Sequence, residues 1–196
     1  MRRVIVLGHE LPTTPDFSLD DLPGSAGRLD VLCRCVTAGL LTSHGIRSNT
    51  EVIVVVQDEL VIRFAGDEVR RLQPDERSTA ARFRDALDAA DEAIGSIVVD
   101  VSPGVTVQRG DLETAVAGAP GRLVRLHGDG TALPETDLGE PATFVLSDHR
   151  SFTDSDDRIL EAAGAESVSV GPLAIHADQA ITVAHNFLDT DGYRHY

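Results

Sequence analysis

Residues 166–189, ESVSVGPLAIHADQAITVAHNFLD, contain the stretch of this chain with the clearest capacity to bind a ligand. Ser167–Val170 is short and predicts a strand, which Gly171-Pro172 would end. The apolar peptide from Val170 to Ile175 is too short for a helix and does not alternate like a strand. Pro172 lacks an N–H, and Gly171 lets another group approach the backbone closely. Such a peptide can offer main-chain groups to a flat, neutral ring such as adenine.

An ordinary strand-to-helix turn over the core is the alternative, since apolar residues recur at helical spacing from Ile181 to Leu188. Two other predicted strands also end in residues able to contact a ligand. The three strand ends are Leu126-His127-Gly128, Leu146-Ser147-Asp148 and Val170-Gly171-Pro172. In open α/β sheets, ligands bind at the carboxyl ends of the strands, so these ends form the predicted site.

Strands that alternate with helices along the chain predict an α/β fold with a largely parallel sheet. We expect strands at 3–7, 51–57, 60–65, 122–126, 143–146 and 167–170. We expect helices from a Ser25 cap through Leu40, from Pro74 to Ile94, and over 111–117, 154–163 and 177–189. The chain of 196 residues suits a single domain, and no repeat or linker divides it.

The composition indicates a protein that works in concentrated salt. The chain has a formal net charge of −15, with 32 acidic residues, and all 17 of its basic residues are arginine. At molar salt the Debye length is only about 3 Å, so the self-repulsion of such a surface is screened. Counterion release then contributes little to nucleic-acid affinity. The affinity must come instead from the planar guanidinium groups of arginine, from stacking and from backbone groups. We therefore expect a halophilic cytoplasm, and the acidity does not exclude an RNA partner.

Several other kinds of chemistry are not supported by the spacing of residues. Gly128 and Gly130 match only part of a dinucleotide fingerprint, no P-loop or nucleophile elbow is present, and the histidines have no metal-ligand spacing. Cys33 and Cys35 point to different faces of a predicted helix, so they cannot form a disulfide there. No apolar run is long enough to span a bilayer, and we expect no metal and a cytoplasmic location.

A second segment, DDLPGSAGRLDVLCRCV over 20–36, adds a more specific signal. With Ser147-Asp148-His149 and 169–189, it resembles the archaeal SPOUT methyltransferases that modify N1 of pseudouridine 54 in the tRNA T-loop. The resemblance runs over essentially the whole chain. It implies an α/β fold with a C-terminal trefoil knot, and one domain over 1–196. The N-terminal half would supply substrate and dimer elements, and about 120–196 would form the knotted cofactor-binding region.

The resemblance further implies that S-adenosylmethionine (SAM) is the cofactor, that tRNA is the substrate and that the protein is a homodimer. The implied cofactor contacts are Leu126, Ser147, Val170, Gly171, Pro172, Leu173, Ala174, Ile175 and Ala180. The chain departs from the family pattern at two of them, with Ala180 where cysteine is frequent and Ser147 where glycine is usual. An rRNA pseudouridine is the alternative substrate, and a non-catalytic RNA-binding module of the same fold is the alternative class.

Methylation at N1 of pseudouridine requires the proton on that ring nitrogen to be removed, and a carboxylate is the simplest general base. Asp21, Asp30 and Asp148 are the candidates. Asp30 has a partner four residues on in Arg34, and Asp148 could be occupied in ordering the cofactor loop. Asp21 lies in the Pro-Gly-rich segment most able to reach a substrate and is favoured. Arg28 is expected to hold a phosphate or carbonyl of the target nucleotide.

Overall fold

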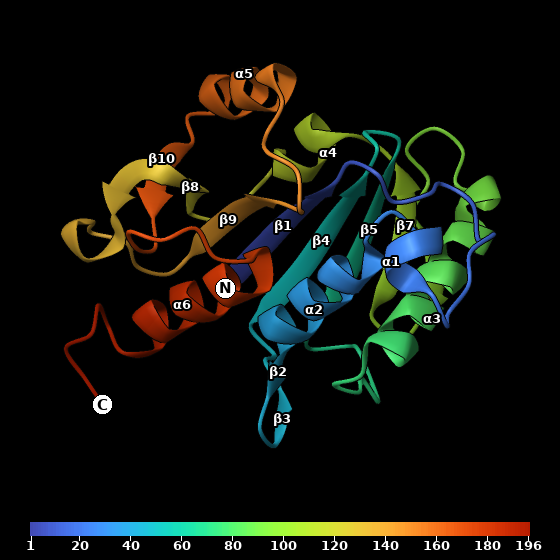
Figure 1. Ribbon diagram of the computed structural model, residues 1–196, viewed down its shortest axis with the longest axis horizontal. Helices are drawn as coiled ribbons and strands as arrows, with labels where there is room; N and C mark the ends of the chain where they lie inside the picture. Colours follow the sequence, from blue (N-terminus) through green and yellow to red (C-terminus); the bar gives the residue numbers. More distant parts are fainter.

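The computed structural model describes residues 1–196 and contains an eight-stranded sheet with helices on both faces (Figure 1). The strands lie in the order β10-β8-β9-β1-β4-β5-β7-β6. Their bounds are β1 Arg2–Gly8, β4 Thr50–Val56, β5 Leu60–Ala65, β6 Val99–Ser102, β7 Val105–Arg109, β8 Arg122–Ala132, β9 Ala142–Ser147 and β10 Glu166–Ser169. A separate small hairpin is formed by β2 Leu41–Thr42 and β3 Gly45–Ile46.

The helices cover the two faces of the sheet unequally. Their bounds are α1 Leu22–Ser25, α2 Leu29–Leu40, α3 Glu76–Asp88, α4 Leu112–Val116, α5 Asp154–Ala162 and α6 Ala177–Asp189, with 3-10 turns at Ala89–Glu92 and Leu133–Glu135. The larger core lies between the sheet and α2, α3 and α6, whereas a smaller core lies under α4 and α5. The predicted stripe of α2 is confirmed, because Leu29, Leu32, Cys33, Val36 and Leu40 are all buried.

Parallel pairing is confined to one half of the sheet. Strand β1 pairs in parallel with both β4 and β9, and β8 pairs in parallel with β9 and β10. The strands β4, β5, β7 and β6 continue the sheet in antiparallel order. Strand β4 is buried along its whole length, in keeping with its β-branched sequence. The carboxyl ends of five parallel strands therefore meet at one edge.

Three helix boundaries differ from the predictions. Ser25 does not cap a long helix, because α1 ends there and α2 begins only after Arg28, whose φ is 63°. Pro74 does not open α3, since the side chain of Asp75 accepts a hydrogen bond from the N–H of Ser78 and caps the helix instead. The helix then ends at Asp88, and Ile94, which was predicted to belong to its apolar stripe, is 70% exposed.

The predicted end of β8 at Leu126 is also wrong, because the strand extends to Ala132. Its pairing with β10 changes register on the way. Ser167 lies opposite Arg125, whereas the next residue, Val168, lies opposite Thr131. Residues 126–130 of β8 therefore lie between two paired segments, and a Cβ atom at Gly130 would lie 2.3 Å from the backbone nitrogen of Val168. Only glycine fits this close approach of the two strands.

A buried arginine joins the start of the chain to its end. Arg2 is 4% exposed and forms ion pairs of 2.7 Å with Glu140 and 2.6 Å with Asp189. Its guanidinium also lies 3.1 Å from Nδ1 of His185, and burial lowers the pKa of that histidine to about 4. His185 is therefore a neutral acceptor that helps to satisfy a buried charge. No helix of the structure has the length and apolarity needed to cross a membrane.

Candidate functional site

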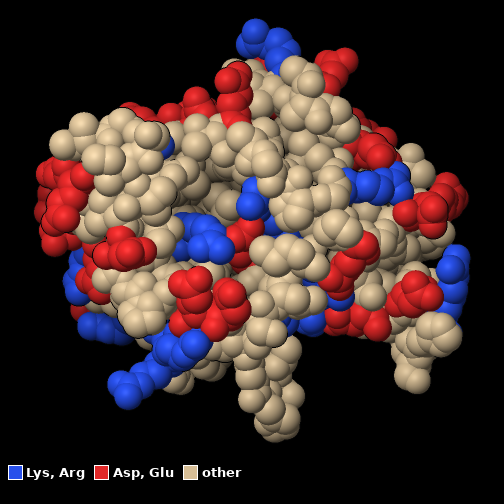
Figure 2. Space-filling view, turned by 180° about the vertical axis from the view of Figure 1, so that it is seen from behind, with Lys and Arg blue, Asp and Glu red and all other residues tan.

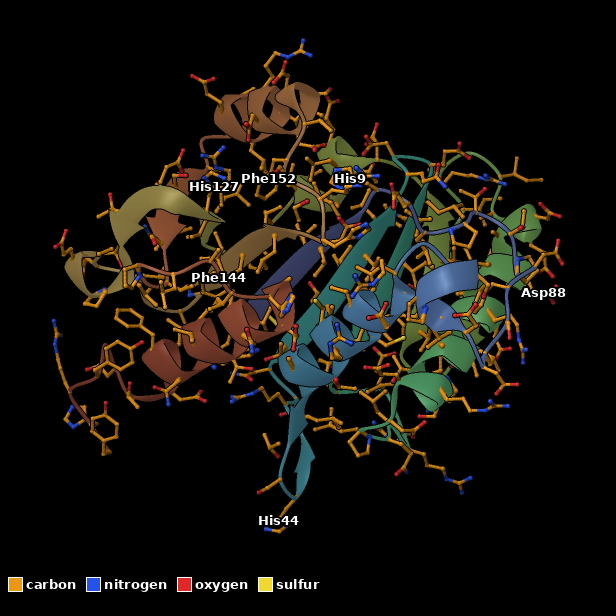
Figure 3. The ribbon with its side chains drawn as sticks, in the orientation of Figure 1. His9, His44, Asp88, His127, Phe144 and Phe152 are labelled. Carbon is orange, nitrogen blue, oxygen red and sulfur yellow. The ribbon has the colours of Figure 1, made fainter.

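Of the three predicted strand ends, those at Ser147 and Val170 lie at or directly after the ends of β9 and β10, whereas Leu126 lies within β8. In the sheet register Leu7 lies opposite Ser147, so β1 and β9 end side by side, at Gly8 and Ser147. His9, His127 and Phe152 lie toward this same end of the sheet (Figure 3). Leu126 and Ala180 belong to the larger core, where they are 8% and 7% exposed.

Apart from Gly171, whose carbonyl and N–H both contact the Ser169 hydroxyl, residues 170–175 have the free main chain that a planar ligand requires. None of them lies in a helix or strand, and no backbone–backbone hydrogen bond involves them. Leu173 is 76% exposed and Ile175 42% exposed, and a Cβ atom at Gly171 would meet nothing within 4 Å. The hydroxyl of Ser169 donates a 2.9 Å hydrogen bond to the carbonyl of Gly171 and orders the start of the loop. Apolar side chains beside unpaired amides and carbonyls fit an adenine ring.

Asp148 follows β9 directly and is almost completely buried, with a side chain that is 1% exposed. Its carboxylate accepts hydrogen bonds from the backbone N–H groups of His9 at 3.0 Å and Arg150 at 2.8 Å. Burial acts to raise the pKa of Asp148, but hydrogen bonds from His9 and these amides outweigh burial and hold the pKa below its ordinary value. An ionised, fully hydrogen-bonded carboxylate anchors a loop and is a poor base.

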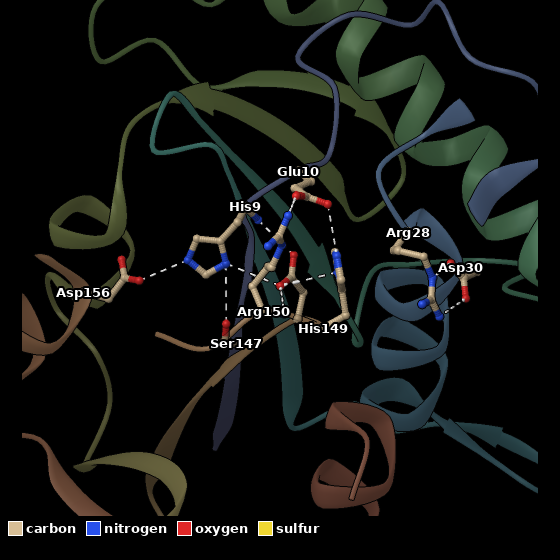
Figure 4. A network of polar contacts seen from close by, with 9 residues as sticks. His9, Glu10, Arg28, Asp30, Ser147, His149, Arg150 and Asp156 are labelled. Atoms are coloured by element: carbon tan, nitrogen blue, oxygen red, sulfur yellow. Dashed lines mark hydrogen bonds and ion pairs between the residues drawn. The ribbon is translucent and has the colours of Figure 1, made fainter. Parts of the chain in front are cut away.

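The imidazole of His9 connects this carboxylate to a second one on α5 (Figure 4). Its Nδ1 lies 3.4 Å from Asp148, and its Nε2 lies 3.0 Å from Asp156. The hydrogen bond to Asp148 is the largest of the effects that raise the pKa of His9 to about 9. Sequence reasoning missed both His9 and Asp156. The signal for His9 was its place directly after Gly8, at the carboxyl end of a buried parallel strand.

Arg28 lies beside this network and is already paired. Its guanidinium donates to both oxygens of Asp30, at 2.9 and 3.1 Å, and Arg34 donates to the same carboxylate at 3.1 Å. Burial opposes ionisation of Asp30, but the two arginines hold its pKa below the ordinary value. Asp30 is therefore a structural anion. Arg34 also lies 3.9 Å from Asp178, in the first turn of α6, so this ion network reaches the helix that follows the predicted cofactor loop.

The conformation of Arg28 depends on the residue before it. Gly27 has a φ of 54° and packs against the loop after β1, so that a Cβ atom there would lie 1.8 Å from the carbonyl oxygen of Glu10. Glu10 in turn pairs with His149 at 3.1 Å and with Arg150. The segment that carries Arg28 is therefore seated on the loop that Asp148 orders, and these two predicted site residues belong to one region.

Of the three predicted carboxylates, Asp21 has the fewest hydrogen-bond partners. It is exposed and accepts one hydrogen bond, 3.1 Å from the N–H of Gly24, which caps α1. No hydrogen bond or ion pair joins Asp21 to Arg28 or Asp148. The structure thus places Arg28 and Asp148 in one region, whereas Asp21 is exposed, is joined to neither of them and has a second carboxylate oxygen without a hydrogen bond.

The chain matches a family described as "Putative SAM-dependent RNA methyltransferase" over residues 1–193. The tRNA (pseudouridine(54)-N(1))-methyltransferase of Haloferax volcanii is 52% identical, and that of Halobacterium salinarum 51%, each over all of both chains. The enzyme of that name from Methanocella arvoryzae is 41% identical over 94% of this chain and 97% of its own.

A solved structure shares the fold at low sequence identity. Archaeoglobus fulgidus Nep1, determined with bound S-adenosylhomocysteine, superimposes with a TM-score of 0.59 and 12% identity. The superposition covers 94% of this chain and 95% of that one, which supports the SPOUT-type α/β fold. The family match over residues 1–193 shows that the chain belongs to the family of SAM-dependent RNA methyltransferases.

Proposed function

We propose that this protein methylates N1 of pseudouridine 54 in tRNA and uses SAM as the methyl donor. The observation that carries the proposal is the full-length identity of about half to relatives that bear this name. The match covers the whole of both chains at this identity, so it supports more than a shared fold. Because tRNA is the proposed substrate, we also propose a cytoplasmic location.

The proposed cofactor contacts are nine residues: Leu126 within β8, Ser147 at the end of β9, the loop over 170–175 and Ala180 in α6. The free main chain of this loop supports the assignment. Bound SAM supplies an electrophilic methyl group on a sulfonium. The amides and carbonyls of the loop would read the adenine edge, and the exposed side chains of Leu173 and Ile175 would cover its faces.

In the proposed reaction the N1–methyl bond forms as the methyl–sulfur bond breaks, and the proton on N1 leaves to a base. We assign this base to Asp21, because Asp30 and Asp148 are held as structural anions whose pKa values are lowered. Arg28 would exchange part of its pairing with Asp30 for a phosphate or carbonyl of the target nucleotide. Positioning of N1 in line with the methyl group supplies much of the rate.

Mass spectrometry of tRNA from a deletion strain tests the substrate assignment. We expect 1-methylpseudouridine to disappear from position 54, while pseudouridine itself remains there. The purified protein should methylate a tRNA that carries pseudouridine 54, and a matched transcript with uridine 54 should be inert because its N1 is bonded to the sugar. Persistence of the modification in the deletion strain would reject the assignment.

The two alternatives predict different results, one in mass spectrometry and the other in calorimetry. If the substrate were an rRNA pseudouridine, the methylated nucleoside would be lost from rRNA and retained in tRNA. If the protein were a non-catalytic RNA-binding module, calorimetry in molar KCl would detect no binding of SAM or S-adenosylhomocysteine.

We also propose that the protein is a homodimer that pairs through the C-terminal region, which we propose is knotted. The support is the apolar character of that region: Leu173 and Ile175 are exposed, and α6 has partly buried Val183 and Leu188 at the margin of the core. Light scattering in molar KCl is expected to give twice the mass of one chain. A monodisperse monomer at micromolar concentration would contradict this prediction.

A further inference from the structure

We infer that His9 is a positioning residue for the proposed reaction: its imidazolium ties the loop Ser147-Asp148-His149 to the N-terminus of α5 and so holds the cofactor pocket in its binding shape. The inference rests on the proposed function, since it concerns the same strand ends. His9 need not touch SAM or the nucleotide. It acts through Asp148, which orders the backbone beside the proposed contact Ser147.

The geometry requires both ring nitrogens of His9 to carry protons. Nδ1 faces Asp148 at 3.4 Å and Nε2 faces Asp156 at 3.0 Å. Both carboxylates are buried, with side chains that are 1% and 2% exposed. A neutral imidazole has one N–H and one acceptor nitrogen, so it would direct a lone pair at one of these anions. Only the imidazolium donates to both.

Each of the two carboxylates already organises a backbone segment. Asp148 accepts the N–H of Arg150 at 2.8 Å, which shapes the turn after β9. Asp156 accepts the N–H of Thr153 at 2.7 Å and completes the capping box of α5. His9 therefore connects two preformed units through one cation. Without it, two buried anions would face the same space with no positive partner between them, which is strongly unfavourable.

Ser147 is the point at which this connection reaches the proposed cofactor pocket. Its hydroxyl lies 3.5 Å from Nδ1 of His9, and its backbone continues directly into Asp148 (Figure 4). A hollow of about 190 Å³ adjoins the other side of His9, between the ends of β1 and β4. That hollow gives the imidazole space to swing away from Ser147 if its pairing with Asp148 weakens.

The charges around His9 favour its protonated form. Asp148 and Asp156 face it from the loop after β9 and from α5, and Asp58, in the turn between β4 and β5, lines the same hollow. Glu10, next in the chain, is directed to His149 and Arg150 instead. The hydrogen bond to Asp148 is the main reason that the pKa of His9 rises from 6.5 to about 9.

The sign of the pH effect follows from this shift. Because the pKa of His9 is higher in the folded protein than in the unfolded chain, its contribution is complete below pH 6.5 and is lost as the pH rises through about 9. Binding of the cofactor should follow the same course, since the loop loses its tie to α5 when the ring becomes neutral.

The test compares the wild type with His9→Gln in calorimetric titrations of S-adenosylhomocysteine in molar KCl. Glutamine can donate to one carboxylate but carries no charge. We expect His9→Gln to weaken the affinity about tenfold or more below pH 6.5, with the difference closing above about pH 9. The amino group of S-adenosylhomocysteine also titrates, but it affects both proteins alike and cancels from the ratio of their affinities. Asp154→Asn, which removes a negative charge from the first turn of α5 at a residue that is not paired with His9, should bind like the wild type.

An NMR titration accompanies the calorimetry. The NMR signals of the His9 ring in the wild type should titrate near pH 9, and Asp156→Asn should move this midpoint down. A His9→Gln protein that folds and binds with the wild-type affinity at every pH would overturn the inference, as would a His9 midpoint near 6.5. Failure of the wild type itself to bind S-adenosylhomocysteine would instead reject the proposed function.

Discussion

Substitution of Asp21 by asparagine is expected to lower the rate of methyl transfer by about 10²–10⁴-fold, the usual contribution of a general base. Asparagine caps a helix as well as aspartate does, so α1 and the loop around it should keep their structure. The affinity for S-adenosylhomocysteine should not change, because the proposed cofactor contacts lie elsewhere. Single-turnover assays with saturating SAM and a tRNA that carries pseudouridine 54 measure the chemical step directly.

Asp20→Asn is the matched control, because Asp20 is adjacent, its side chain is 80% exposed and its partner is the surface residue Arg77. It should turn over like the wild type. Arg28→Ala should differ from both, with weaker tRNA binding and a smaller effect on the chemical step. Wild-type turnover by Asp21→Asn would remove this residue from the mechanism and would require a base from outside the segment 20–36.

The variant Gly27→Ala is expected to lose about 2–4 kcal/mol of unfolding free energy, the largest effect on stability that we predict from a single methyl group. A left-handed conformation costs an L-residue about 1–2 kcal/mol, and the new Cβ atom would also lie 1.8 Å from the carbonyl oxygen of Glu10. Backbone atoms must move apart to relieve this contact. Thermal denaturation in molar KCl measures the loss, and tRNA affinity should fall with it because Arg28 is displaced.

Gly118→Ala isolates the conformational part of this effect. Gly118 has a φ of 67° and a Cβ atom there would meet nothing within 4 Å. Its substitution should cost only about 1 kcal/mol and leave tRNA binding intact. Equal losses in the two variants would mean that the contact between Gly27 and Glu10 does not constrain the folded protein.

Periodic apolar patterns correctly predicted the helices and strands that pack one face against the core. The stripe of α2, the strands β4 and β5 and the bounds of α6 agree with the structure because a helix or strand against a core must repeat its apolar residues at a fixed spacing. The assignment of Ile94 to the apolar stripe of α3 was wrong. Isoleucine fits the helical period there, but the chain had already left the helix at Asp88.

Contacts between distant segments set the features that local patterns could not reveal. The break between α1 and α2 depends on Gly27 meeting the Glu10 carbonyl, and the length of β8 depends on its shift against β10. The site shows the same division. Strand ends predicted Ser147 and Asp148, whereas the pairing of His9 with Asp156 joins residues 147 positions apart. Nothing in either local sequence encodes that meeting.

The burial of Arg2 also bears on the order in which the protein assembles. Its two carboxylate partners stand 138 and 187 positions later in the chain, the second of them at the end of α6. During synthesis β1 emerges before the strands that flank it. Arg2 can pair with Glu140 once β9 is in place, but its pairing is complete only when Asp189 at the end of α6 has docked. Central placement of β1 therefore makes the full pairing of its first residue depend on segments that are made much later. Such long-range closure slows folding, because contacts between residues far apart in the sequence form late.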